Sequence, residues 1–139
     1  MRRYPSVNFT RVNYNNLNSR QQENFNFAKL ACVLAEYGFT ALRLSDDWKG
    51  ADLIAVHIEG DRDIKVQLKG RLTFERKYLN KNLWIAFRAG ETWYLYDHDA
   101  LFDRVRERIE GTDSWREHGG YSWPGLPVWA SDLLDAYRL

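Results

Sequence analysis

Apolar residues recur along the chain at two spacings, and each spacing predicts one kind of secondary structure. In residues 19–38, Leu30 and Leu34 belong to a set of apolar positions repeated every three or four residues, which predicts an amphipathic helix. Ser19 is the expected N-cap, because a glutamine three residues later would complete a capping box. Gly38 is the expected stop.

Shorter apolar or alternating runs follow, and they predict strands. The turn sequence EGDRD joins the second and third of these runs, which indicates an antiparallel hairpin, and RAGE joins the last two. Residues 70–82 are basic and fit either a loop or a short helix. The expected strands are residues 39–44, 51–58, 63–69, 83–87 and 92–97, and the expected later helices are residues 101–110 and 131–139, the last with Ser131 as its cap.

This order of elements predicts a single α/β or α+β domain over residues 1–139, with a mixed central β-sheet flanked by helices. The length suits one domain with its own core. Residues 1–18 are asparagine-rich and are expected to form an irregular N-terminal arm. Residues 111–139 form a Trp/Pro-rich C-terminal extension, irregular but packed before its terminal helix.

Cysteine usage and the lengths of the apolar runs bear on location. Cys32 is the single cysteine, lies in the apolar run LACVL and is expected to be a small buried residue. No apolar run in the sequence approaches the roughly 18 residues of a membrane span. Both features predict a cytoplasmic protein without membrane contact.

The net charge of +1 argues against a nucleic-acid-binding protein, but the charges are unevenly distributed. Residues 64–90 hold seven of the 20 lysines and arginines and one of the 19 acids, for a net charge of +6. The remainder holds thirteen cations and eighteen acids, for a net charge of −5. The basic segment is either a phosphate-binding surface or a solvated face.

Three polar side chains occupy positions in the central hairpin where apolar residues are expected. Asp52 opens an apolar strand, where a carboxylate needs a partner, while Gln67 and Lys69 lie two residues apart on the next strand and share one face. The hairpin is expected to bring Asp52 to the end of that strand. A carboxylate, an amide and an ammonium would then surround one point. The alternative is that this face meets water.

The segments GADLIAV and KVQLKGR resemble the catalytic hairpin of the PD-(D/E)xK nuclease superfamily, which has the restriction-endonuclease-like fold. The family pattern is an acid on a leading helix, an aspartate that opens one strand, and acid-x-lysine on the next. Glu23, Asp52 and Gln67-x-Lys69 match this pattern. Ala51 stands where the pattern has proline, and a glutamine in place of the acid is found in some members.

The resemblance implies a metal-dependent endodeoxyribonuclease that uses Mg²⁺, with Mn²⁺ as an alternative ion. Asp52, Gln67, Glu23 and Lys69 are the implied catalytic residues. The implied metal ligands are Asp52, Gln67, Glu23 and the main-chain carbonyl of Leu68, which are hard oxygen donors. Lys69 would stabilise developing phosphate charge or orient the attacking water. Because Gln67 brings no charge, we expect weaker metal binding and more dependence on Glu23.

Glu23 is chosen over Glu36 on helical geometry. Glu23 aligns with the apolar stripe of its helix, whereas Glu36 falls about 140° away, toward solvent. The alternative role for Glu23 is a favourable interaction with the helix N-terminus. Asp46-Asp47 fits either a second acidic pair near Asp52 or a solvated loop. Asp97-His98-Asp99 is expected to form a turn or a helix cap, with metal ligation as the alternative.

DNA is the expected partner. A duplex needs two cuts and the chain offers one candidate site, so a homodimer or a higher homo-oligomer is expected. The C-terminal tryptophans are expected to form a packed lid or a subunit contact, with base stacking as the alternative. The candidates for contacts with nucleic acid are Lys65, Arg71, Arg76, Lys77, Lys81 and Arg20.

The sequence is compatible with two functions other than a nuclease. The neutral Gln67 is compatible with a nuclease fold that has lost catalysis and serves as a nucleic-acid-binding or assembly module. The tryptophan-rich C-terminus is compatible with a structural or inhibitory protein that binds another protein.

Overall fold

The computed structural model of the chain describes residues 8–139, apart from the side chains of residues 47 and 48. Short 3-10 turns lie at Tyr14–Asn16, Arg76–Tyr78, Arg106–Arg108 and Asp135–Tyr137. The helices and strands are α1 (Ser19–Glu36), β1 (Phe39–Trp48), β2 (Ala51–His57), β3 (Asp63–Lys69), β4 (Thr73–Glu75), β5 (Leu83–Ala89), β6 (Thr92–Asp97), α2 (His98–Val105), α3 (Asp113–His118), β7 (Gly120–Ser122) and α4 (Val128–Leu134).

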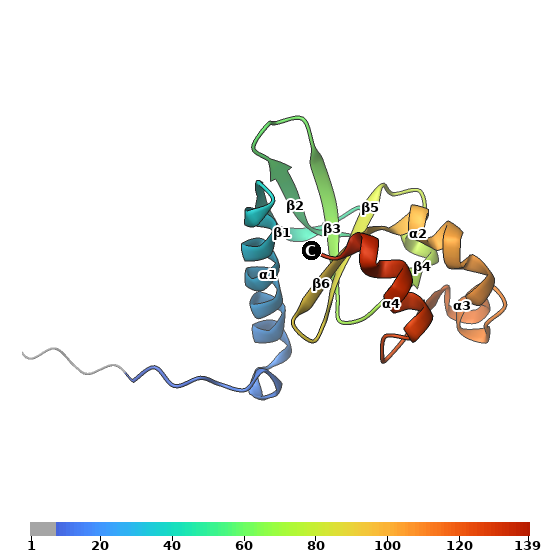
Figure 1. Ribbon diagram of the computed structural model, residues 1–139, viewed down its shortest axis with the longest axis horizontal. Helices are drawn as coiled ribbons and strands as arrows, with labels where there is room; N and C mark the ends of the chain where they lie inside the picture. Colours follow the sequence, from blue (N-terminus) through green and yellow to red (C-terminus); the bar gives the residue numbers. More distant parts are fainter. Residues whose placement is uncertain (1–7) are drawn as a thin grey trace, which may run out of the picture.

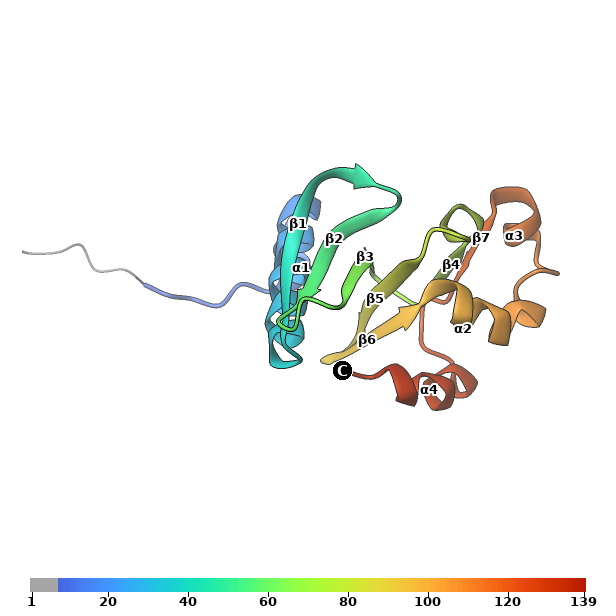
Figure 2. The ribbon, with the colours of Figure 1, turned by 90° about the horizontal axis from the view of Figure 1, so that it is seen from above.

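The central sheet has five strands in the order β1-β2-β3-β5-β6 (Figures 1 and 2). Its neighbours pair antiparallel, except for β3 and β5, which pair parallel. The sheet is therefore mixed, and the predicted single domain with a mixed sheet flanked by helices is confirmed. A second, two-stranded sheet pairs β4 with β7.

Two apolar clusters hold the domain together. In the first, Leu30 and Leu34 of α1 pack with Leu53, Ala55 and Val66 of the sheet. The helix lies along β1 and β2, as Figure 2 shows. Complete burial of one leucine side chain contributes about 1.5–3 kcal/mol, so this apolar stripe is enough to dock α1. The docked helix carries Glu23 toward the ends of the strands.

The second cluster lies on the opposite face of the sheet, because its residues alternate along β5 and β6 with those of the first cluster. Helices α2, α3 and α4 gather away from α1 (Figure 1). Ile85 and Tyr96 pack there with Leu101 of α2 and Leu134 of α4. Trp115 of α3 belongs to the same cluster. The C-terminal extension is thus part of the packed domain. Residues 8–13 form no helix or strand, and residues 1–7 of the predicted arm lie outside the described part.

Several local predictions were wrong. The cap of α1 is Asn18, whose side chain accepts from the N–H of Gln21 in a reciprocal capping box one residue earlier than expected. Cys32 is exposed, because it lies about 200° around the helix from Leu30. Helix α4 begins three residues before Ser131.

The segment after β3 holds elements that the apolar pattern did not show. Strand β4 is three residues long and pairs with β7, which lies in the stretch expected to be irregular. The Trp123 N–H donates to the Leu72 carbonyl over 3.2 Å and extends the contact between these two segments. Strands this short have no periodicity, so long-range pairing alone defines them.

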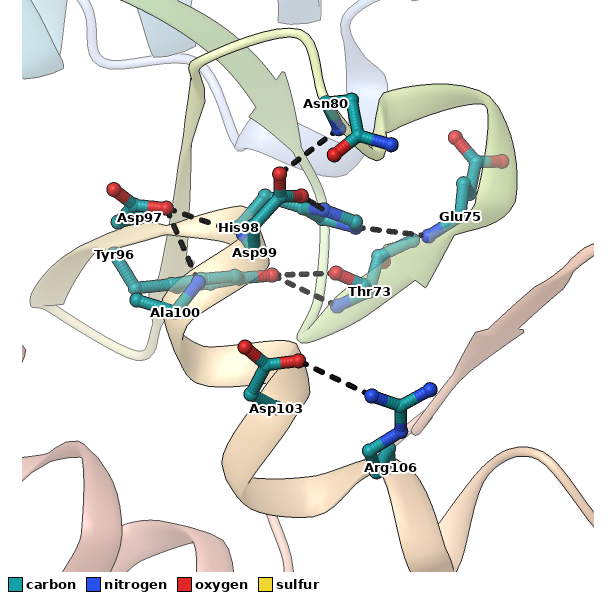
Figure 3. A network of polar contacts seen from close by, with 10 residues as sticks. All are labelled: Thr73, Glu75, Asn80, Tyr96, Asp97, His98, Asp99, Ala100, Asp103 and Arg106. Atoms are coloured by element: carbon teal, nitrogen blue, oxygen red, sulfur yellow. Dashed lines mark hydrogen bonds and ion pairs between the residues drawn. The ribbon is translucent and has the colours of Figure 1, made fainter.

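A buried polar network joins this segment to β6 and α2, and Figure 3 shows it. The hydroxyl of Tyr96 donates to the Thr73 carbonyl over 2.6 Å and accepts from the Thr73 N–H over 3.3 Å. Burial raises the pKa of Tyr96 above its ordinary value, so this phenol stays protonated as the donor. Asp97 caps α2 by accepting from the N–H groups of Asp99 and Ala100, as the sequence predicted for this acidic run.

Candidate active site

A cleft opens where the ends of β2 and β3 meet β1 and the N-terminal half of α1. Its lining brings together residues that lie far apart in the sequence. Among those that line it are Arg20, Glu23, Asp46, Asp52, Gln67 and Lys69. All four residues of the predicted catalytic set therefore face one hollow.

The pairing of β2 with β3 positions two of these residues. Leu53 pairs with Val66, and this register continued by one residue sets Asp52 opposite Gln67. Asp52 Oδ2 accepts a hydrogen bond from the Leu68 N–H over 2.8 Å. The carboxylate at the start of β2 is thus tied to the end of β3.

Gln67 and Leu68 present polar groups to the same cleft. The Gln67 side chain is half-buried, and its Nε2 lies 3.4 Å from the Leu68 carbonyl oxygen, at the long end of hydrogen-bond distances. A bond this long is weak and easily exchanged. The amide can therefore reorient toward a ligand without a large loss of hydrogen-bond energy.

Lys69 lies at the rim of the cleft and contacts a residue that sequence reasoning missed. Its Nζ lies 3.3 Å from Glu75 Oε2, and both side chains are 24% exposed. The same Nζ lies 5.3 Å from the ring centre of Tyr78. Lys77 also approaches Glu75 Oε2, at 3.8 Å, but its side chain is 70% exposed. Glu75 therefore pairs with the Lys69 ammonium at the rim of the cleft.

Contacts at both its carboxylate and its main chain position Glu75. Burial alone would raise its pKa, but the Tyr78 hydroxyl and the ammonium groups of Lys69 and Lys77 outweigh burial, so its pKa is lowered. Its main-chain N–H donates to His98 Nε2 over 3.1 Å (Figure 3). Glu75 lies on the short strand β4, and nothing in the local pattern of the sequence identifies it as a partner of Lys69.

His98 is fully buried, and its two ring nitrogens have different partners. Because Nε2 accepts from Glu75, the proton belongs on Nδ1, which lies 3.1 Å from Asp99 Oδ1. Asp99 Oδ2 accepts from the Asn80 N–H over 2.8 Å. Burial lowers the pKa of His98, despite the opposing effect of Asp99, so the imidazole is neutral. The relay joins α2 to the strand that carries Glu75.

Helix α1 contributes the remaining acid. Glu23 is exposed and lines the cleft one turn before the apolar stripe, whereas Glu36 lies at the far end of the helix. Asp46 lies on strand β1, not in a loop, and also lines the cleft, whereas the side chain of Asp47 lies outside the described residues. The hollow thus holds three carboxylates and the amide of Gln67.

The residues expected to contact nucleic acid are spread more widely. Arg20 lines the cleft, and Arg71 lines a neighbouring groove. Arg76 instead donates to the Trp115 carbonyl over 2.7 Å and stacks on its ring. Lys65 Nζ donates to the main-chain carbonyl of Lys81 over 2.5 Å. Lys65, Arg76, Lys77 and Lys81 are absent from the lining of both hollows.

The C-terminal tryptophans pack against the domain. Trp115 is buried and stacks on Phe102 with ring centres 5.0 Å apart. Trp123 is half-buried and meets Trp129 edge to face at 5.4 Å. These contacts make the segment part of the packed domain.

A separate group of possible metal ligands lies in the turn between β2 and β3. One ligand atom from each of His57, Glu59 and Asp61 lies within 4.8 Å of the others. His57 Nδ1 already accepts from the Glu59 N–H over 3.3 Å, and both acids are at least 60% exposed. The group does not line the cleft.

No protein-family model and no curated protein sequence matches this chain. In residues 8–139, no helix is long and apolar enough to cross a membrane.

The donors that line the cleft fit a hard divalent cation. Its side-chain oxygen donors are the carboxylates of Glu23, Asp46 and Asp52, the amides of Asn26 and Gln67 and the hydroxyl of Ser45. The cations Arg20, Arg43 and Lys69 line the cleft as well, and no histidine or cysteine of the described residues does. Oxygen donors of this kind suit Mg²⁺ or Mn²⁺ better than zinc. Asp52, Glu23, Gln67 and the Leu68 carbonyl are the groups that could hold the ion.

The free energy of unfolding is expected to fall on acidification in two steps. Because the folded pKa of His98 lies below about 6.5, the unfolded chain takes up a proton that the folded chain refuses, and stability is lost as the pH falls below that value. Glu75 has a folded pKa below 4.5, so its contribution is present above that pH and is lost as the pH falls through the folded pKa. Urea unfolding across this pH range measures both steps.

Two histidine variants test the assignment. His98→Gln should lack the first step, and His118→Gln, which alters an exposed histidine, should keep it. A free energy of unfolding that stays constant or rises between about pH 7.5 and pH 5.5 would contradict the buried neutral imidazole.

Proposed function

We propose that this chain is a Mg²⁺-dependent DNA endonuclease of the PD-(D/E)xK type. One observation carries the proposal: Glu23, Asp52, Gln67 and Lys69, contributed by three separate elements, line a single cleft. The sequence pattern relates these residues by spacing alone, and the fold could have scattered them. Their convergence is what a phosphodiester-cleaving site requires.

Each residue has a role that its environment supports. Asp52 and Glu23 supply negative charge and Gln67 a neutral oxygen toward the metal, which when bound polarises the scissile phosphate and lowers the pKa of an attacking water. Lys69, held at the rim by Glu75, places a positive charge where phosphate charge develops. Arg20 and Arg43 place two further cations in the cleft.

The assembly is proposed from the chemistry of the substrate. One chain offers one candidate site, and cutting both strands of a duplex requires two. We therefore propose a homodimer or a higher homo-oligomer, with a nicking monomer as the alternative.

Asp52→Asn is expected to reduce metal-dependent plasmid cleavage at least about a thousandfold, which corresponds to about 4 kcal/mol of lost transition-state stabilisation. The asparagine oxygen can still accept from the Leu68 N–H, so the variant removes charge but keeps the tie to β3. The rate at which supercoiled plasmid is converted to the nicked or linear form, in Mg²⁺ or Mn²⁺, measures the effect.

Asp61→Asn is the matched control, because it removes an exposed carboxylate from the turn between β2 and β3. This variant should cleave like wild type. Cleavage by Asp52→Asn at the wild-type rate would contradict the proposal.

Gln67→Glu is expected to lower the Mg²⁺ concentration for half-maximal cleavage by about tenfold or more, because ligand charge strengthens the binding of a divalent cation. This variant also distinguishes a catalytically active wild-type site from one that has lost catalysis. A wild-type protein that binds DNA without cleaving it, together with a cleaving Gln67→Glu variant, would favour the alternative function as a nucleic-acid-binding module. An unchanged Mg²⁺ requirement would show that Gln67 does not contact the ion.

A further inference from the structure

Arg43 of β1 lines the cleft, although nothing in the sequence pattern singles it out. Its main chain pairs with Leu53 of β2, and Leu53 pairs in turn with Val66 of β3. Neighbouring strands lie about 4.8 Å apart, so Arg43 lies one strand away from the strand that carries Asp52. Lys69 lies on the strand at the other side of β2. The strand order therefore places one cation on each side of Asp52.

The guanidinium of Arg43 lies on the side of the sheet that α1 covers. It donates from Nη1 to Asn24 Oδ1, and its Cζ lies 5.5 Å from the ring centre of Phe27. Both partners belong to α1, and Glu23 lies directly before Asn24 and one turn before Phe27. Arg43 and Glu23 therefore share the wall of the cleft that α1 forms, whereas Lys69 lies at the rim beside Glu75.

These contacts orient the guanidinium and leave most of its donors available. A guanidinium has five N–H donors, and the bond to Asn24 uses one of them. Arg43 is exposed, and no acid in the described part of the chain forms an ion pair with it. Arg62, Arg106 and Arg116 differ, because each has a carboxylate partner. An oriented arginine with neutral partners loses little side-chain entropy when it binds an anion.

The charges that line the cleft balance one another. The three cations are Arg20, Arg43 and Lys69, and the three acids are Glu23, Asp46 and Asp52. A divalent cation held by the acids would add two positive charges to this neutral lining. The cleft would then attract an anion, and Arg43 would reach it from the α1 wall with its unused donors.

We infer that Arg43 binds a phosphate of the nucleic acid at the α1 wall of the cleft. The inference rests on the proposed function, because the proposed metal site is what brings a phosphodiester into the cleft. The planar guanidinium can donate to two phosphate oxygens at once. The alternative role of Arg43 is structural, because its bond to Asn24 also ties β1 to α1.

Salt-dependent binding of a fluorescent DNA duplex tests the inference. Anisotropy measures binding in Ca²⁺, a hard cation that oxygen ligands also hold. Arg43→Gln should reduce the slope of log K against log salt by about one, because each phosphate contact contributes about 0.9 to that slope. Arg43→Lys keeps the charge and should retain the slope. Arg62→Gln, in the turn between β2 and β3, is the matched control and should bind like wild type.

The outcomes distinguish the inference from the proposed function. A wild-type slope in Arg43→Gln would overturn the inference, and a lower free energy of unfolding in the same variant would assign Arg43 the structural role. If Arg20→Gln reduced the slope in that case, the cleft would remain the DNA site. An equal reduction in Arg62→Gln would also overturn the inference, because net charge alone would explain it. No binding by the wild-type protein at any salt concentration would overturn both the inference and the proposed function.

Discussion

The antiparallel pairing of β2 with β3 is the constraint on which the candidate site depends. It sets Asp52 opposite Gln67, and the bond from the Leu68 N–H to Asp52 closes the pair. A shift of the register by one residue would turn Gln67 and Lys69 to the other face of the sheet. The apolar residues of β3 pack under α1 and prevent this shift, so the packing of one core also fixes the chemistry of the cleft.

The second half of the domain supports the first through Glu75. This residue holds Lys69 at the rim, and the buried imidazole of His98 fixes the main chain of Glu75. The chain of contacts therefore runs from α2 to the cleft. A buried network of this kind is costly when it is only partly satisfied, and loss of His98 would leave the Glu75 N–H without this acceptor.

The sequence predicted the fold class and the five strands of the main sheet, because long apolar patterns define α1, β2 and β3 directly. It also singled out Glu23, Asp52, Gln67 and Lys69, which line the cleft, but not Asn26, Arg43 or Ser45, which line it too. It did not predict β4 and β7, since three-residue strands carry no periodicity. For the same reason it missed Glu75. It also predicted a buried Cys32, because its neighbours in the sequence are apolar, whereas the residue lies on the solvent-facing side of the helix. Arg76 and Lys65, both candidates for contacts with nucleic acid, donate to main-chain carbonyls of the domain, and long-range packing alone determines these partners.

The most direct test of the central claim is calorimetric titration of the protein with Mn²⁺. If Glu23, Asp52 and Gln67 form one metal site, the wild-type protein binds the ion, Asp52→Asn abolishes binding, and His57→Ala leaves it unchanged. The absence of binding to the wild-type protein, or binding that survives Asp52→Asn and disappears in His57→Ala, would contradict the account.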